Sequence, residues 1–179
     1  MLAQKIKVLI ADDHIIFRRG LKMLLASIDG IELVGEAENG LDLLAVAGRY
    51  TPDVFLIDIS MPVMDGVMAT KELCKRHPGA KVIALSVFGQ ETHIMEMLDA
   101  GALGYLMKNA DKDDIEQAIV SVFNNRSYFC TESNKQVKDL IEKFQSGSKE
   151  HLVVFSEREK DIITLICKGF ISKEIACTL

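Results

Sequence analysis

The sequence predicts an α/β fold in which helices cover both faces of a parallel sheet. Short apolar runs alternate with longer segments of helical period from Lys5 to about Asn125, and five such pairs can be counted. This alternation is typical of βα units. Polar side chains stand where the apolar runs end, which is the arrangement expected of a site at the carboxyl edge of the sheet.

The composition of the runs predicts their order in the sheet. Three of them, at residues 6–11, 54–57 and 82–85, are almost wholly apolar, as expected of central strands buried on both faces. The run at 31–37 contains Glu32 and Glu36 and is therefore expected at an edge. With a fifth run at 105–107, this favours the doubly wound, flavodoxin-like strand order 2-1-3-4-5, whose switch point lies between strands one and three.

The segments between the runs carry amphipathic stripes that would cover the sheet. Apolar residues recur at helical spacing in the first helix and in the last one. The stripes are Phe17, Leu21, Leu24, Leu25 and Ile28, and Ile115, Ala118, Ile119, Val122 and Phe123.

Length and composition bound the class of protein. A chain of 179 residues accommodates one well-buried domain and a smaller appendage. Hydrophobic residues make up 49% and charged residues 26%, and the apolar stretches are far shorter than the ~20 residues of a membrane span. We expect a cytoplasmic protein without a membrane partner. The net charge of −5 gives no general signature of nucleic-acid binding.

The alternation of apolar runs with helical segments stops after Asn125. The sequence therefore predicts three parts: a domain at 5–125, a linker with a short helix at 126–152, and a second unit at 153–179. Residues 127–132 read as irregular, and a helical stripe follows at 137–144. In the second unit, the segment 156–159 (SERE) has capping-box spacing, and Gly169 is placed to end that helix.

Asp12, Asp13, Asp58, Ser86 and Lys108 are the polar residues that end the strands. Each one alone could simply mark a turn or a helix start. Together, the carboxylates would repel one another unless a cation shares the site, and Mg²⁺ prefers such oxygen ligands. A carboxylate in that setting can become a nucleophile that forms an aspartyl phosphate, with the lysine and the serine contacting the phosphoryl oxygens.

These positions fall in motifs that resemble the receiver domain of bacterial two-component response regulators. The motifs are 8–14 (VLIADDH), 58–66 (DISMPVMDG), 84–86 (ALS) and 101–108 (GALGYLMK). The resemblance implies that Asp58 is the phosphoacceptor and that Asp12, Asp13, Asp58 and the backbone carbonyl of Ser60 hold Mg²⁺. It assigns phosphoryl binding to Ser86 and Lys108. It also assigns to Tyr105 an aromatic switch that turns inward on phosphorylation.

Residues 156–179 resemble the start of a LuxR-type helix-turn-helix domain, as in the NarL/FixJ subfamily. The matching segments are 155–159 (FSERE), 166–169 (ICKG) and 172–176 (SKEIA). The resemblance places 173–179 on the supporting helix, and the recognition helix would need about ten further residues. We therefore expect no specific DNA binding by this chain, although the complete effector domain would bind DNA.

The first interpretation is a phosphorylation-controlled transcription regulator with a histidine kinase as partner and a homodimer as its phosphorylated state. A receiver that acts only by dimerisation or by titrating a kinase is the alternative. A phosphohydrolase is a weaker third, because no second acid stands two residues after Asp58. Receivers transfer the phosphoryl group once per signalling event, so we do not expect an enzyme.

Overall fold

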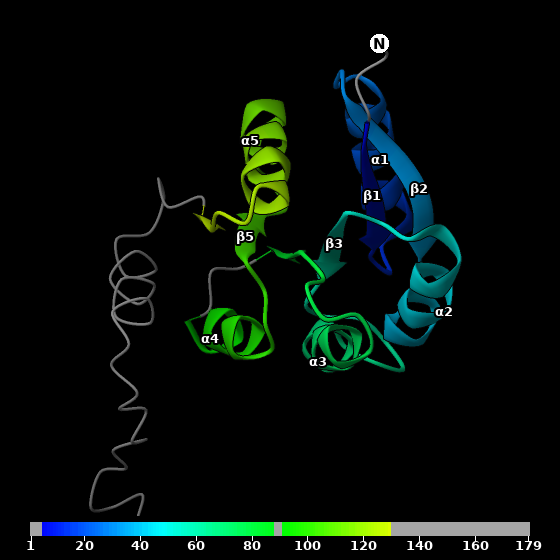
Figure 1. Ribbon diagram of the computed structural model, residues 1–179, viewed down its shortest axis with the longest axis vertical. Helices are drawn as coiled ribbons and strands as arrows, with labels where there is room; N and C mark the ends of the chain where they lie inside the picture. The colour runs from blue at the N-terminus through cyan, green and yellow to red at the C-terminus, as the bar shows by residue number, and fades with distance from the viewer. Residues whose placement is uncertain (1–4, 88–90, 130–179) are drawn as a thin grey trace, which may run out of the picture. The chain divides into compact units, whose positions relative to one another are not determined.

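The computed structural model describes residues 5–87 and 91–129 of the chain. They form a parallel sheet whose strands are separated by helices, as predicted (Figure 1). The strands are β1 (Ile6–Ala11), β2 (Ile31–Ala37), β3 (Val54–Asp58), β4 (Val82–Ser86), β5 (Gly104–Met107) and β6 (Tyr128–Phe129). The helices are α1 (Ile15–Ala26), α2 (Gly40–Tyr50), α3 (Gly66–Arg76), α4 (Glu91–Asp99) and α5 (Lys112–Phe123).

The strand order is β2-β1-β3-β4-β5-β6. The predicted order of the first five strands is confirmed, and β2 lies at an edge as expected. The sixth strand is a correction, because residues 127–132 read as irregular in the sequence. Two residues are too short a run to show any periodicity. They form a strand because β5 offers them a backbone partner, with Gly104 opposite Tyr128 and Tyr105 opposite Phe129.

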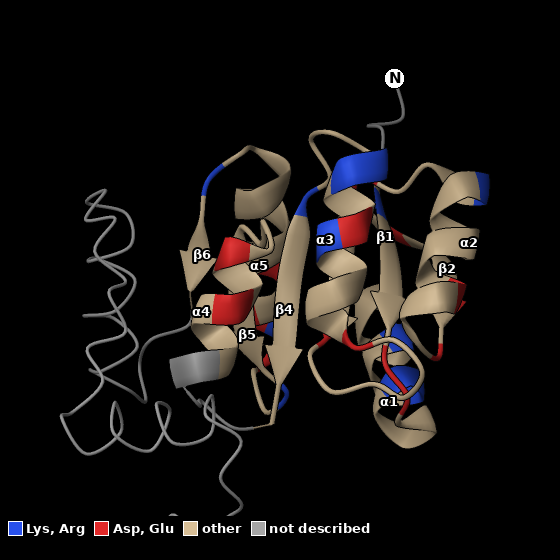
Figure 2. Ribbon diagram, turned by 90° about the horizontal axis from the view of Figure 1, so that it is seen from below, with Lys and Arg blue, Asp and Glu red and all other residues tan. Residues whose placement is uncertain are grey.

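The helices cover both faces of the sheet and divide the core into two layers (Figures 1 and 2). The buried residues of α1 and α5 pack on one face of the sheet, against side chains such as Val8 and Leu56. Those of α2, α3 and α4 pack on the other face, against side chains such as Leu9 and Ile57. The alternation of neighbouring strand residues between the two layers follows from the two-residue period of a strand. Both faces of the central strands are therefore buried, as their apolar sequences predict.

Acidic and amide side chains fix the starts of three helices. Asn39, Asp65 and Asp111 each accept a hydrogen bond from the backbone N–H three residues later, at the N-termini of α2, α3 and α5. Such caps satisfy N–H groups that have no partner within the helix. The predicted stripes are largely buried, but Phe123 is still 36% exposed because it ends α5, where the Lys81 ammonium lies 4.8 Å from its ring centre.

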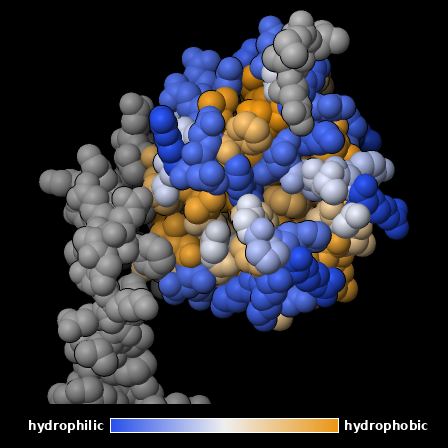
Figure 3. All heavy atoms as spheres, in the orientation of Figure 1, coloured by the Kyte–Doolittle hydropathy of each residue, from blue (hydrophilic) through white to orange (hydrophobic). Residues whose placement is uncertain are grey.

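Several expectations concern residues that the structure does not describe. The predicted helix at 137–144 and the predicted helix-turn-helix unit at 153–179 both lie outside the described residues. Over the described residues, the surface in view is mainly hydrophilic and encloses smaller hydrophobic patches (Figure 3). Within that part of the chain, none of the helices has the length and apolar character to cross a membrane.

Candidate functional site

The carboxyl edge of the sheet gathers the polar residues that end its strands. Asp12 and Asp13 follow β1, Asp58 is the last residue of β3, and Ser86 is the last residue of β4. Lys108 follows β5, and its backbone N–H donates to the carbonyl oxygen of Ser86 at 2.7 Å. Because the strands are parallel, their ends meet at one edge, and all five predicted side chains come to the same region.

A pocket of about 190 Å³ opens at this edge. Asp58, Ser60, Ser86 and Lys108 line it, together with His14, Val87 and His93. A larger groove of about 490 Å³ runs along β2, but its Lys22 and Glu36 pair with each other at 2.6 Å. We therefore place the chemistry in the smaller pocket, where acidic groups converge.

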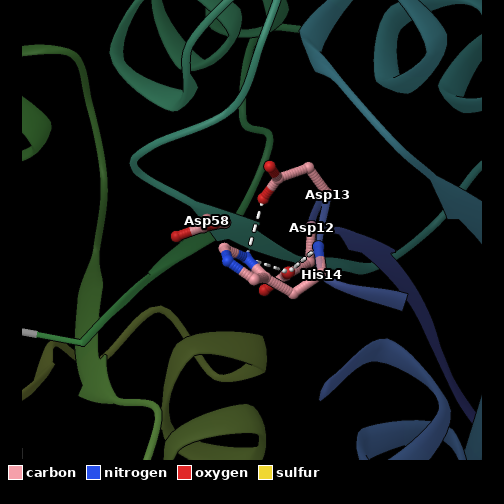
Figure 4. A group of neighbouring side chains, drawn as sticks. All are labelled: Asp12, Asp13, His14 and Asp58. Carbon is pink, nitrogen blue, oxygen red and sulfur yellow. Dashed lines mark hydrogen bonds and ion pairs between the residues drawn. The ribbon is translucent and has the colours of Figure 1, made fainter. Parts of the chain in front are cut away.

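Three carboxylates and one imidazole lie within reach of a single cation. One ligand atom from each of Asp12, Asp13, His14 and Asp58 lies within 4.8 Å of the others (Figure 4). The Asp12 side chain is fully buried and Asp58 is 3% exposed, whereas Asp13 reaches the surface. Oxygen donors at a partly buried, partly open site suit a hard divalent ion that keeps some of its water ligands. The residues present therefore fit Mg²⁺.

Lys108 is the counter-charge to the two buried acids. Its ammonium lies 2.7 Å from Asp12 Oδ2 and 2.8 Å from Asp58 Oδ2, and its side chain is only 9% exposed. The ring of Phe17 lies beside this lysine, with its centre 4.9 Å from the same ammonium. Such a lysine remains charged because the two carboxylates compensate for its burial.

The pKa values of the site follow from burial and from these contacts. Burial raises the pKa of Asp58 and the charge of Asp12 adds to this, while the hydrogen bond and charge of Lys108 and the backbone of Ser60 oppose it without cancelling it. Burial by itself lowers the pKa of Lys108, but the hydrogen bonds and charges of Asp12 and Asp58 outweigh it and raise that pKa. One ammonium thus does not neutralise two carboxylates, and a further cation would relieve the remaining repulsion.

The loop after Asp58 is shaped by Gly66, the first residue of α3. Its N–H donates to the carbonyl oxygen of Ile59 at 2.9 Å. A Cβ at position 66 would stand 2.1 Å from the carbonyl oxygen of Asp58, closer than any side chain tolerates. The helix can approach the end of β3 this closely only because residue 66 is glycine.

Tyr105 lies inside the protein, next to the polar edge. It is 2% exposed and its hydroxyl donates to the Met107 sulfur at 3.7 Å. Burial raises its pKa, and a hydrogen bond with the Ser86 side chain opposes that rise. Because β6 flanks β5, Tyr105 does not lie on an edge strand. Ser86 and Tyr105 are in contact. Tyr105 already lies inside the protein in this structure, so the inward turn on phosphorylation and the switching role of both residues stay predictions.

Arg18 is a residue of this region that sequence reasoning missed. It is 7% exposed, and its Nη1 donates to the carbonyl oxygen of Asp12 at 2.5 Å. One signal could have revealed it: Arg18 falls at helical spacing with Leu21 and Leu25, so a charge interrupts the buried stripe of α1. His14 is the N-cap of α1, with a 64% exposed side chain and its Nδ1 2.8 Å from Asp13 Oδ1.

A doubly wound parallel sheet with a buried carboxylate, further acids and a lysine at its carboxyl edge defines a phosphoryl-handling α/β domain. Residues 8–120 match the model of the response regulator receiver domain. The chain belongs to this family, and it is a response regulator of two-component signal transduction.

Curated relatives and solved structures agree with this placement. The response regulator GacA of Pseudomonas protegens is 38% identical over 161 residues, covering 90% of this chain and 75% of GacA. The uncharacterized transcriptional regulatory protein YhcZ of Bacillus subtilis is 35% identical over 173 residues, covering 97% of this chain and 80% of YhcZ. A structure of RcsB dimers bound to two parallel DNAs has a TM-score of 0.74 at 25% identity, covering 98% of this chain and 83% of that one.

Proposed function

We propose that Asp58 accepts a phosphoryl group from a histidine kinase and that this modification controls a transcription regulator. The observation that carries the proposal is the position of Asp58: it is a buried carboxylate with the Lys108 ammonium at 2.8 Å, and it lines the pocket at the carboxyl edge. Because burial raises its pKa, the Asp58 carboxylate is more basic than an ordinary one, which suits a nucleophile.

In the proposed reaction, an Oδ atom of Asp58 forms a bond to phosphorus while the bond from phosphorus to the donor imidazole breaks. The electron pair of the broken bond leaves with the imidazole nitrogen. Lys108 neutralises charge on the phosphoryl oxygens, and the hydroxyl of Ser86 donates to one of them. The product is an acyl phosphate on Asp58.

Mg²⁺ would be held by Asp12, Asp13, Asp58 and the backbone carbonyl of Ser60. When bound, it supplies positive charge that reduces the repulsion between the carboxylates and the incoming phosphoryl oxygens. The carboxylates of this chain provide the oxygen ligands, and the position of Asp13 near the surface leaves room for water ligands.

After transfer, Asp58 carries roughly −1.5 to −2 charges and new acceptor oxygens. The Ser86 hydroxyl would turn toward these oxygens and give up its hydrogen bond with Tyr105. The two side chains thus connect the proposed phosphorylation site to β5 through a hydrogen bond. The domain accepts one phosphoryl group per signalling event and does not turn over a substrate.

Exposed apolar side chains next to the site favour a protein as the phosphodonor. Ile16 directly follows the metal-binding loop on α1 and is 84% exposed, Val63 is 80% exposed in the loop before α3, and Val87 is 53% exposed after Ser86. Exposed apolar side chains that gather on one surface can mark a site for protein interaction. We further propose a homodimer as the phosphorylated state, DNA as the target of the complete effector domain, and a cytoplasmic location.

Acetyl phosphate with Mg²⁺ tests the reaction. The wild-type chain should gain the mass of one phosphoryl group, and Asp58→Asn should gain none. Asp29→Asn, an exposed acid before β2, is the matched control and should behave as wild type. Phosphorylation at another residue, located by peptide mass spectrometry, would refute the assignment of Asp58.

A further inference from the structure

Arg18 is a charged residue buried beneath the proposed metal site. Its side chain is 8% exposed and extends from α1 to the carbonyl oxygen of Asp12, which accepts from Nη1 at 2.5 Å. This carbonyl belongs to the peptide that joins Asp12 to Asp13. A single contact from Arg18 therefore bears on the backbone that carries both acids.

The same stretch of backbone is held from two further sides. The N–H of Asp12 donates to the carbonyl oxygen of Ala37 in β2 at 3.1 Å. Asp12 Oδ1 accepts from the N–H of His14 at 2.8 Å. The N–H and the side chain of Asp12 are thus fixed by other groups, and Arg18 fixes its carbonyl oxygen. Without Arg18, this carbonyl would lose the hydrogen bond that sets the tilt of the 12–13 peptide.

Acidic residues around β2 balance the charge of Arg18. Its Nη2 lies 2.7 Å from Glu38 Oε1 and its Nε lies 3.7 Å from Glu36 Oε2. Lys22, one turn further along α1, shares Glu36 at 2.6 Å. Figure 2 shows basic residues of α1 beside acidic residues of the neighbouring segments. Because the guanidinium is paired, its net repulsion of a nearby cation is small.

We propose that Arg18 is a positioning residue for the divalent cation, acting through the Asp12–Asp13 peptide. The inference rests on the proposed function of this site. The guanidinium fork binds the carbonyl oxygen with one nitrogen and Glu38 with another, so it ties the metal-binding loop to the segment after β2. Residues that orient the ligands of a metal typically contribute 10–100-fold to its affinity.

A positioning role and a purely electrostatic role of Arg18 predict opposite changes in cation binding when Arg18 is removed. If Arg18 orients the loop, its removal weakens cation binding. If its positive charge mattered most, its removal would strengthen cation binding, because a cation–cation repulsion would vanish. The direction of the change therefore separates the two.

The experiment compares Arg18→Met, Arg18→Lys and Lys22→Met with the full wild-type chain. Calorimetry with MgCl₂ gives the dissociation constant, and acetyl phosphate labelling across a Mg²⁺ series gives the half-saturating concentration and the maximal rate. Arg18→Met should raise both the dissociation constant and the half-saturating concentration about tenfold, with the maximal rate at saturating Mg²⁺ unchanged. Arg18→Lys should be intermediate, because an ammonium keeps the charge without the fork.

Lys22→Met is the matched control, since it removes a cation and an ion pair from the same helix without touching Asp12. It should leave Mg²⁺ binding unchanged.

A dissociation constant for Mg²⁺ that is unchanged or lower in Arg18→Met would overturn the inference. A lower maximal rate with an unchanged half-saturating Mg²⁺ concentration would also overturn it. If Arg18→Met does not fold, Arg18→Lys decides, because it keeps the positive charge and loses the fork: about threefold weaker binding supports the inference, and unchanged binding overturns it. Failure of the wild type to bind Mg²⁺ would instead refute the proposed function, and this inference with it.

Discussion

Asp58 is buried beside one positive and one negative side chain, and this combination decides its chemistry. Burial raises its pKa above the ordinary value of 3.8, and Lys108 only partly offsets the effect. The folded chain therefore holds a proton on Asp58 more tightly than the unfolded chain does. The stability that this contributes is fully present below pH 3.8 and is lost as the pH rises through the folded-state pKa.

Asp58→Asn should therefore be more stable than wild type at neutral pH in the absence of divalent cations. The amide removes the buried negative charge, and Lys108 keeps its contact with Asp12 at 2.7 Å. We expect a gain of about 1 kcal/mol near neutral pH that shrinks as the pH falls toward ~4. Urea unfolding across this pH range measures it, with Asp29→Asn as control. A variant less stable than wild type at neutral pH would show that the ion pair with Lys108 outweighs burial.

Val63 has a backbone conformation that is unfavourable for a branched side chain. Its φ is +68°, and the N–H of Met64 donates to the carbonyl oxygen of Pro62 at 2.7 Å, which closes a tight three-residue turn around it. Such a conformation costs a β-branched residue about 1–3 kcal/mol. The side chain is 80% exposed, so little packing compensates for the cost.

Val63→Gly should stabilise the protein by about 1 kcal/mol. Glycine removes the strain and adds a smaller entropic cost of about 0.5–1 kcal/mol in the unfolded chain. Chemical denaturation measures the change. Val63→Ala, which keeps a Cβ in the left-handed region, should give a smaller gain. Destabilisation by glycine would mean that the turn is not strained in solution.

At the scale of elements, the approach of α3 to the end of β3 sets the geometry of the site. The contact between Gly66 and the carbonyl oxygen of Asp58 leaves no space for a Cβ. Any side chain there would have to push α3 away from β3 or shift the backbone of Asp58 itself. Stability and phosphorylation are therefore coupled at this position.

Gly66→Ala should destabilise the domain by about 2–4 kcal/mol and slow the labelling of Asp58 by acetyl phosphate. Gly48→Ala is the matched control: it lies in α2 with nothing within 4 Å of the added Cβ, so alanine should stabilise by about 0.5–1 kcal/mol. Thermal unfolding and mass labelling of both variants provide the comparison. Normal labelling and stability in Gly66→Ala would contradict the close contact.

Most of the elements could be predicted because their signals are local. The apolar runs ended within one residue of the observed strands β1, β3, β4 and β5. The helical stripes of α1 and α5 placed Leu21, Leu25, Ile115 and Ile119 in the core. The strand β6 could not be predicted, since its two residues pair with β5 only after the chain has folded.

At the scale of the whole molecule, a phosphoryl group on Asp58 must change a surface to have an effect. Ser86 and Tyr105 connect the site to β5 through their hydrogen bond. The relative RcsB forms dimers on DNA in a solved structure. Phosphate-dependent dimerisation is the surface change that we propose for this chain.

Acetyl phosphate with Mg²⁺ should therefore shift the wild-type chain from monomer toward dimer in sedimentation velocity. Asp58→Asn should keep one sedimentation coefficient under the same conditions. Tyr105→Ala should be phosphorylated but dimerise less, because the route from Ser86 to the surface is interrupted. A phosphorylated wild type that remains monomeric at micromolar concentration would exclude the dimer.

The sequence by itself determined which residues end the strands β1 to β5, the class of the sheet and the carboxylates that gather at its edge. These features follow from local hydrophobic periods and from the rule that parallel strands place their carboxyl ends together. Only the tertiary structure decided that Lys108 contacts both Asp12 and Asp58, that Tyr105 is buried behind β6, and that Arg18 holds the Asp12–Asp13 peptide. The physical reason is that these contacts join residues from different elements, and their distances depend on how the packed helices and strands fit together.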